Sequence, residues 1–299
     1  MARHILENEE ICIEVDTHGA ELKSLVRKDT GTEYMWKADP QFWGRTSPVL
    51  FPFVGSVNKK EFRTKGKTYT MNQHGFARDM DFKLEHQTAD EMWFVLSSNE
   101  ETLEKYPYAF VLKLGYRISG SSVEIIWQVE NPSDEELPFS IGGHPAFNCP
   151  IDPVKKQTDY QLHFDVEGPL VSSRLEDGLT GTIKDTYPLQ NGYLPLTEQL
   201  FDNDALIIEK QKVKKVQICD REGNAYLTVT MDAPLFGIWS PTGKQAPFVC
   251  IEPWYGRCDS KDFTGDLNER AYGNSIAPGE IWKKGFTVTV YFPLGILSN

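Results

Sequence analysis

Histidine is scarce in this chain, and three of its six histidines stand beside glycine, of which His18 lies in an expected turn near the N-terminus and two have a more specific setting. His74 precedes Gly75, and His144 follows Gly143. Glycine permits unusual backbone conformations and lets another group approach closely. Both segments follow strand-like runs, and loops on a rigid scaffold commonly carry binding residues. Because imidazole exchanges protons near neutral pH, we expect His74 and His144 to be functional. A histidine that caps a turn would give the same local pattern.

A third candidate is the carboxyl group of Glu252, which follows the apolar residues 248–251 and precedes Pro253. We expect Pro253 to end this strand. A carboxylate at the end of a buried strand is costly unless it is paired or useful. Burial raises its pKa towards the range of a general base. The alternative is a glutamate that simply emerges into solvent.

Other residues have side chains suited to a sugar. Aromatic rings stack on the apolar face of a pyranose, although in a β protein such rings belong more often to the core. Guanidinium and carboxylate groups bond sugar hydroxyls. The stacking candidates are Trp43, Trp239, Trp254 and Tyr255, and the hydrogen-bonding candidates are Arg45, Arg78 and Asp204.

The elements that must position these residues are strands. Apolar residues alternate with polar ones in residues 11–16, and again in residues 110–118 and 123–129, which predict a hairpin around Gly120. The same alternation predicts a closing strand over residues 286–292. A Lys65-Gly66-Lys67 turn predicts a further, shorter hairpin.

Helical signals are few. Ser98 and Glu101 resemble a capping box, which predicts a short helix that Pro107 stops. A further turn or two of helix is expected within residues 259–269. We therefore predict an all-β protein, a large antiparallel β-sandwich with few short helices, in which residues 1–299 form a single domain.

Composition excludes several classes of function. The net charge of -12 argues against a nucleic-acid partner, because a phosphate backbone favours a basic surface. The five cysteines contain no CxxC pair, so neither a metal site nor a disulfide framework is expected. No apolar run reaches the roughly 20 residues that span a bilayer, and the first ten residues do not resemble a signal peptide. We expect a cytoplasmic protein with no membrane partner.

Four segments together resemble those of the aldose 1-epimerase (galactose mutarotase-like) superfamily, and more closely its LacX-like branch. They are Trp43-Gly44-Arg45-Thr46-Ser47-Pro48-Val49-Leu50-Phe51-Pro52, His74-Gly75-Phe76-Ala77-Arg78, Gly142-Gly143-His144-Pro145-Ala146-Phe147 and Ile251-Glu252-Pro253-Trp254. The resemblance implies a galactose mutarotase-like supersandwich that interconverts the α and β anomers of aldoses.

The resemblance also assigns roles. It implies that Glu252 is the general base and His144 the general acid, and that His74 and Arg45 hold the sugar. Asp204 resembles the family's substrate-binding aspartate, with Asp202 as the alternative. The form of the segment that ends in Arg78 is more typical of LacX-like and hexose-phosphate-mutarotase-like proteins, which leaves the substrate open.

Mutarotation suits these residue types. A base takes the proton of the anomeric hydroxyl, an acid protonates the ring oxygen, and the ring opens and recloses. This chemistry needs no cofactor and no metal. The expected ligand is a small-molecule sugar or sugar phosphate, and the expected assembly is a monomer or homodimer. The alternatives are a hexose-6-phosphate mutarotase, a non-catalytic carbohydrate-binding protein and a glycoside hydrolase, which would need a second carboxylate.

Overall fold

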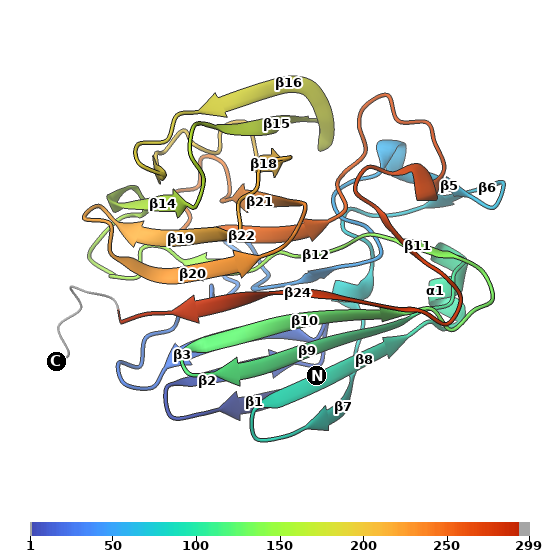
Figure 1. The fold of residues 1–299 in the computed structure, drawn as a ribbon, viewed down its shortest axis with the longest axis horizontal. Helices are drawn as coiled ribbons and strands as arrows, with labels where there is room; N and C mark the ends of the chain where they lie inside the picture. The colour runs from blue at the N-terminus through green and yellow to red at the C-terminus, as the bar shows by residue number, and fades with distance from the viewer. Residues whose placement is uncertain (1, 293–299) are drawn as a thin grey trace.

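The computed structural model describes residues 2–292, and antiparallel strands dominate it (Figure 1). The larger of its two main sheets has nine strands. Their order is β17 (Tyr193–Pro195), β14 (Tyr160–Phe164), β19 (Lys215–Asp220), β20 (Ala225–Met231), β24 (Ile281–Val290), β10 (Ser122–Glu130), β9 (Val111–Ser119), β8 (Glu91–Ser97) and β7 (Lys83–Gln87).

The second main sheet has eight strands and carries the site described below. Their order is β16 (Leu179–Tyr187), β15 (Leu170–Glu176), β18 (Leu206–Glu209), β21 (Leu235–Trp239), β22 (Phe248–Tyr255), β12 (Ile141–Gly143) and β4 (Val49–Leu50), with β13 (Ala146–Asn148) also paired to β22.

Smaller elements surround these sheets. The strands are β1 (Arg3–Glu7), β2 (Ile11–Asp16) and β3 (Glu21–Arg27) in one sheet, β11 (Leu137–Phe139) with β23 (Asn274–Ile276), and β5 (Glu61–Thr64) with β6 (Lys67–Thr70). The helices are α1 (Glu100–Lys105) and the short 3-10 turns η1 (Asn58–Lys60), η2 (Ala77–Asp79), η3 (Gln157–Asp159) and η4 (Leu267–Glu269).

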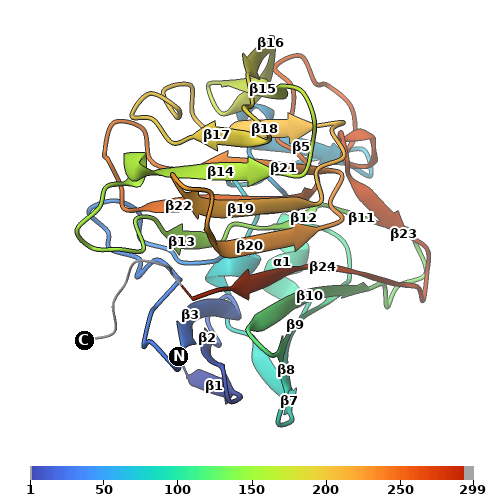
Figure 2. The same cartoon turned by 60° about the vertical axis from the view of Figure 1, so that its left-hand side comes forward.

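The two main sheets share one hydrophobic core. Val249 and Ile251 of β22 enter the same buried cluster as Ile218 of β19 and Val288 of β24. Figure 2 shows β19 and β20 overlapping β22 as separate layers. Apolar residues alternate along these strands because successive side chains point to opposite faces. The predicted all-β, largely antiparallel sandwich is confirmed.

Several predicted elements are also confirmed. The hairpin is formed by β9 and β10 around Gly120, the shorter one by β5 and β6, and the closing strand by β24, which ends at Val290 rather than at Phe292. The single-domain prediction for residues 1–299 stays a prediction. Within residues 2–292, no helix has the length and apolar character that crossing a membrane requires.

The predicted helix exists, but its cap is different. Asn99 caps α1, because its side chain accepts a hydrogen bond from the Thr102 amide at 2.9 Å. The Thr102 hydroxyl oxygen in turn accepts one from the Asn99 amide at 2.8 Å. The Ser98 hydroxyl instead accepts from the Phe110 amide at 3.2 Å. The capping box is therefore one residue later than Ser98 predicted.

The prediction that Pro253 ends its strand is wrong. Strand β22 continues through Pro253 to Tyr255, so Glu252 lies inside the sheet. The Ile251 amide donates to the Pro145 carbonyl, and in a strand the nitrogen two residues later points the same way. The nitrogen of Pro253 thus points towards the gap between β12 and β13, where its missing N–H interrupts little of the ladder.

Candidate active site

The side chain of Glu252 points away from the main core. Val249 and Ile251 face the core between the sheets, so Cys250, Glu252 and Trp254 share the opposite face of β22. Glu252 is nevertheless only 1% exposed. The neighbouring strand β21 places Gly237 directly beside it. The sheet therefore holds a buried carboxyl group on a rigid central strand.

His144 lies in the break between β12 and β13, next to that carboxyl group. Its amide donates to the Pro48 carbonyl at 3.1 Å, which fixes the backbone. Its Nε2 atom lies 3.3 Å from Oε2 of Glu252. The ring of Trp43 stacks on the imidazole with centroids 4.6 Å apart, and Trp239 meets it edge-on. The predicted acid and base are thus in contact.

His74 completes a histidine pair. It lies in the loop after β6 with a positive φ of 68°, and its ring centroid is 5.8 Å from that of His144. Its Nδ1 atom accepts a hydrogen bond from the Gly55 amide at 3.1 Å. In the neutral ring the proton must therefore be on Nε2. Gly75 allows this loop to pass Phe51, because a Cβ atom at Gly75 would lie 2.3 Å from the Phe51 carbonyl oxygen.

These residues line one cavity of about 330 Å³. Eight of the ten candidate residues named above belong to it, and Arg45 and Tyr255 do not. Tyr255 instead packs in the main hydrophobic core. The lining residues are Trp43, Val54, Gly55, Gln73, His74, Arg78, His144, Leu175, Gly178, Asp204, Ala205, Ile207, Trp239, Glu252, Trp254 and Cys258. Nothing in the sequence around Gln73, Leu175 or Cys258 signals their place here.

The two predicted arginines are arranged differently. Arg78 lines the cavity, and its Nη2 donates to the Gln73 carbonyl at 2.8 Å. Arg45 lies outside the lining, and its Nη2 is 2.6 Å from a carboxylate oxygen of Asp79. Asp79 lies 3.8 Å from Nε of Arg78 as well. One carboxylate therefore partly offsets two guanidinium charges at this edge of the cavity.

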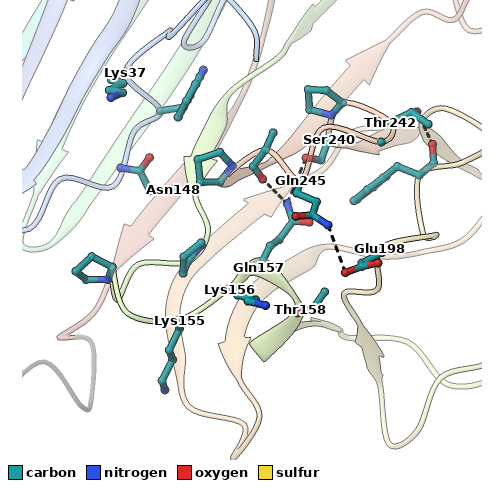
Figure 3. A pocket seen from close by; sticks show the side chains of 18 of the residues that line it. Lys37, Asn148, Lys155, Lys156, Gln157, Thr158, Glu198, Ser240, Thr242 and Gln245 are labelled. Carbon is teal, nitrogen blue, oxygen red and sulfur yellow. Dashed lines mark hydrogen bonds between the residues drawn. The ribbon is translucent and has the colours of Figure 1, made fainter. Parts of the chain in front are cut away.

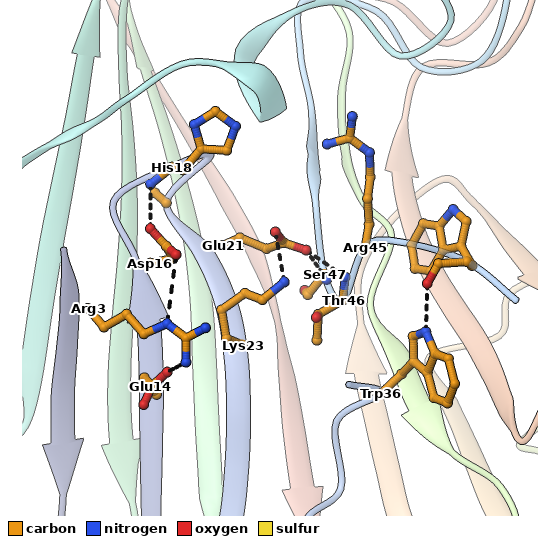
Figure 4. A network of polar contacts seen from close by, with 12 residues as sticks. Arg3, Glu14, Asp16, His18, Glu21, Lys23, Trp36, Arg45, Thr46 and Ser47 are labelled. Carbon is orange, nitrogen blue, oxygen red and sulfur yellow. Dashed lines mark hydrogen bonds and ion pairs between the residues drawn. The ribbon is translucent and has the colours of Figure 1, made fainter. Parts of the chain in front are cut away.

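A buried carboxylate outside the cavity holds the segment that carries Arg45. Glu21 of β3 accepts hydrogen bonds from the Thr46 and Ser47 amides at 2.6 and 2.8 Å, and from Lys23 at 3.2 Å (Figure 4). The Thr46 carbonyl accepts from the Ala146 amide. Glu21 is thereby linked, through one short segment, to the backbone that carries His144.

The two candidate aspartates point to different places. Asp204, with a φ of 69°, lines the cavity that holds Glu252. Asp202 lines a separate cleft of about 910 Å³, shown in Figure 3. In that cleft Gln157 donates to the hydroxyl oxygen of Ser240 and to two backbone carbonyls. Of the two alternatives, the structure brings Asp204 to the histidines and Glu252.

Burial controls the charges of the contacting pair. It raises the pKa of Glu252 well above its usual range, the nearby charge of Asp204 adds to this, and the indole N–H of Trp254 opposes both. Burial also lowers the pKa of His144 to about 3, against a backbone hydrogen bond and with help from Arg78 and Arg45. Both shifts favour the uncharged forms, a protonated Glu252 beside a neutral His144.

The other polar groups are shifted for the same reason. Burial lowers the pKa of His74 well below its usual value, and the charges of His144, Arg78 and Arg45 act in the same direction. Burial also lowers the pKa of Arg78 to about 10. At neutral pH, His74 is therefore an uncharged hydrogen-bonding group, and Arg78 remains a cation.

A metal ion fits this site poorly. His144, Cys250 and Glu252 bring three potential ligand atoms within 4.8 Å of one another. Zinc binds cysteine as the thiolate. Burial and the charge of Glu252 raise the pKa of Cys250 well above its usual value, so its thiol keeps its proton. The expectation that no metal or other cofactor is needed stays a prediction.

Several polar atoms of the cavity are left without a partner. Among residues 2–292, no hydrogen-bond partner reaches Oε2 of Glu252, Nδ1 of His144, Nε1 of Trp254 or Nε of Arg78, although all four atoms are buried. Buried polar atoms in native proteins are nearly always paired. Four such atoms at one cavity are available to a polar ligand.

Comparisons with known proteins place this site in a family. The model of the aldose 1-epimerase family matches residues 3–288. The plasmid-borne LacX protein of Lactococcus lactis subsp. lactis is 34% identical, over 95% of this chain and 98% of that protein.

Two solved structures are also similar. One is a galactose mutarotase related enzyme from Lactobacillus acidophilus, with 36% identity, a TM-score of 0.92, and coverage of 97% of this chain and 98% of that one. The other is a galactose mutarotase-like protein from Lactobacillus casei ATCC 334, with 30% identity, a TM-score of 0.90, and coverage of 97% and 100%. This chain belongs to the aldose 1-epimerase family, and it is an isomerase with a small-molecule sugar substrate.

Proposed function

We propose that this protein is an aldose 1-epimerase that interconverts the α and β anomers of a hexose, with Glu252 and His144 as the proton-transferring pair. The observation that carries the proposal is the 3.3 Å contact between His144 Nε2 and Glu252 Oε2 in the wall of a cavity of about 330 Å³. Ligand pockets of about this volume are typical for small molecules.

In the proposed reaction, Glu252 and His144 each transfer one proton when the ring opens and one when it closes. Glu252 takes the proton of the anomeric hydroxyl, the bond between the anomeric carbon and the ring oxygen breaks, and the ring oxygen takes a proton from His144. The aldehyde end rotates, and the same transfers run backwards to close the ring. The anomeric hydroxyl and the ring oxygen sit on one carbon atom, so an acid and a base in contact can serve both.

For His144 to protonate the ring oxygen, its imidazole must carry the extra proton before the ring opens. Burial alone favours the opposite state, with the proton on Glu252, because it disfavours both charged forms. Sugar hydroxyls that donate to the Glu252 carboxylate stabilise its charged form. The contact between the two side chains then lets the proton pass to His144. The pair holds one proton throughout.

The remaining groups position the sugar. His74, whose Nδ1 accepts from the Gly55 amide, offers Nε2–H to a sugar oxygen. Arg78 and Asp204 supply a donor and an acceptor for hydroxyls. Trp43 and Trp239 hold the His144 ring from two sides and form an apolar wall. Arg45 acts from outside the lining, through its charge and its pairing with Asp79.

The charges at the cavity favour a free hexose over a hexose-6-phosphate. A phosphate favours two or more unpaired cations. Arg45 is paired with Asp79, and Arg257 is paired with Glu209 at 2.7 Å and does not line the cavity. Arg78 lines it together with the carboxylate of Asp204. A cytoplasmic location and a monomeric or homodimeric assembly stay predictions.

Polarimetry of freshly dissolved α-D-glucose and α-D-galactose tests the function, with anomer exchange of hexose-6-phosphates followed by NMR. We expect the protein to speed equilibration of at least one free hexose more than that of its phosphate. A faster phosphate would favour the hexose-6-phosphate mutarotase. Binding without any acceleration would favour the non-catalytic carbohydrate-binding protein, and release of sugar from an aryl glycoside would favour the hydrolase.

A further inference from the structure

The indole ring of Trp254 sits in a slot between two glycines. Gly142 of β12 pairs with Trp254, and Gly237 of β21 pairs with Glu252, so one glycine lies on each neighbouring strand. A Cβ atom at Gly142 would lie 2.7 Å from Cδ1 of the indole. A Cβ atom at Gly237 would lie 2.6 Å from Cη2. An alanine at either of these two positions would therefore place its methyl group against the indole ring.

This slot limits what the ring can do. Trp254 is only 6% exposed, although it lines the cavity. The neighbouring backbone confines the indole on both strands, which leaves little of its face for stacking on a pyranose. Its Nε1–H is buried and acts on the Glu252 carboxyl group, whose pKa it lowers, but no acceptor among residues 2–292 is placed for a well-formed hydrogen bond with it.

An unpaired acceptor stands on the same face of the same strand. Glu252 and Trp254 are two residues apart in β22, so both side chains point to the cavity side. Oε2 of Glu252 is also buried, and apart from the 3.3 Å approach of His144 Nε2 it has no hydrogen-bond partner among residues 2–292. A hydroxyl group is the simplest ligand that satisfies both atoms, because its proton goes to the carboxylate while its oxygen accepts from the indole.

The position of Glu252 identifies that hydroxyl. Under the proposed function, the hydroxyl that gives its proton to Glu252 is the one on the anomeric carbon. We propose that Trp254 is a catalytic residue whose indole N–H donates to the anomeric oxygen while Glu252 takes the proton from it. The inference rests on the proposed function and adds a role that differs from the sugar stacking expected of Trp254.

The step balances in charge and electrons. The O–H bond of the anomeric hydroxyl breaks and its proton goes to Glu252, so negative charge builds on the anomeric oxygen next to the N–H. That electron pair then forms the C=O bond of the aldehyde. The bond to the ring oxygen breaks, and the ring oxygen takes the proton of His144. A fixed donor aimed at developing charge stabilises the transition state more than the ground state.

The effect of Trp254 on the pKa of Glu252 agrees with this role. The indole N–H lowers this pKa, against the effect of burial, so it favours negative charge at this place. The two glycines leave room for the ring in this position, which a side chain on either strand would fill.

Trp254→Phe tests the donor, because it keeps an aromatic ring and removes the N–H. We expect kcat for the preferred hexose to fall by about 10²-fold, as for the loss of one oxyanion donor, with KM little changed. Trp282→Phe, in β24 and outside the cavity lining, is the matched control and should keep the wild-type kcat. Gly237→Ala should displace the ring and lower kcat in the same way. A wild-type kcat in Trp254→Phe would overturn the proposal.

A second measurement does not depend on turnover. The indole N–H signals of the ¹⁵N-labelled protein are recorded while D-glucose or D-galactose is added, and the Trp254 signal is assigned by its loss in Trp254→Phe. We expect this signal to move with the hexose and to move much less with an analogue that lacks the anomeric hydroxyl.

The outcomes separate the two proposals. Equal movement with both ligands would overturn the role of Trp254 and leave the mutarotase proposal intact. A wild-type protein that neither binds nor equilibrates a hexose or a hexose-6-phosphate would overturn the proposed function, and the role of Trp254 with it.

Discussion

At the residue scale, one proton shared between two buried side chains explains the choice of His144 and Glu252. Neither charged form is favoured in the empty cavity, because burial lowers the pKa of the imidazole and raises that of the carboxyl group. The state with one proton therefore extends over a wide range of pH. An unperturbed pair would leave that state at about pH 4 and pH 6.5.

The pH dependence of kcat/KM follows from these directions. The pKa of His144 is lowered to about 3, so the imidazole gains its extra proton only below that pH. The pKa of Glu252 is raised, so the pair loses its last proton above the usual range of a carboxyl group. We expect kcat/KM to stay constant from about pH 4 up through about pH 6.5, with no fall centred on the pH at which an unperturbed imidazole would lose its proton. A steady decline across this interval, with the enzyme still folded, would contradict the shared-proton account.

The two histidines should differ when replaced by asparagine. His144→Asn removes the proposed acid, so we expect kcat to fall by about 10²–10⁴-fold. His74→Asn keeps a hydrogen-bonding group and should mainly raise KM. Steady-state kinetics of both variants test this, with His163→Asn, in β14 and outside the lining of this cavity, as the control. A kcat loss with unchanged KM in His74→Asn would make His74 a proton-transferring residue instead.

At the element scale, short segments rather than long strands bring the site together. His144 lies where β12 breaks before β13, His74 lies in a loop after β6, and Asp204 lies in a turn before β18. The backbone of residues 45–48 holds the His144 segment, since Thr46 and Pro48 accept hydrogen bonds from Ala146 and His144. The position of His144 therefore depends on hydrogen bonds between loops, whereas strand β22 holds Glu252.

Glu21 offers a test of this dependence. Glu21→Ala leaves the buried Thr46 amide and the Ser47 amide without an acceptor, which costs about 1–3 kcal/mol for each unsatisfied group. We expect lower thermal stability and a raised KM. Glu21→Gln keeps a carbonyl oxygen for both amides and should restore most of both properties. Glu14→Ala, on β2 at an ion pair with Arg3, is the control. Equal losses in the Gln and Ala variants would argue against an acceptor role.

The sequence predicted strands better than it predicted how loops meet. The alternation of apolar and polar residues located β9, β10 and β24, because this pattern depends only on the residues of the strand itself. The sequence did not predict that β22 continues through Pro253, because a strand accepts a proline there only where the neighbouring strands leave a gap. It also left Asp202 as an alternative to Asp204, because sequence alone does not show that one turn sends the two side chains to different cavities.

At the scale of the whole molecule, the packed interior covers most of the thiol groups. Cys149, Cys219, Cys250 and Cys258 are buried, and Cys12 is half-buried. All five thiols are free, in line with the expectation that the chain contains no disulfide framework. Of the four segments that carry the family resemblance, three belong to the eight-stranded sheet, through β4, β12, β13 and β22, and the fourth follows β6.

Thiol reactivity reports on this core. Burial raises the pKa of Cys12 only in part, whereas burial raises that of Cys149 to about 12. Because the thiolate is the reactive form, we expect Cys12 alone to react readily with Ellman's reagent in the folded protein, and all five cysteines to react in denaturant. Rapid reaction of several thiols without denaturant would contradict the packing described here.

The central claim is that Glu252 transfers a proton during anomer exchange. Polarimetry with the hexose that responds best should compare the wild type with Glu252→Gln and with the exposed control Glu222→Gln. We expect Glu252→Gln to lose about 10²–10⁴-fold in kcat while it still binds the sugar and stays folded. The control should keep the wild-type rate. A folded Glu252→Gln variant that equilibrates the anomers as fast as the wild type would contradict the account.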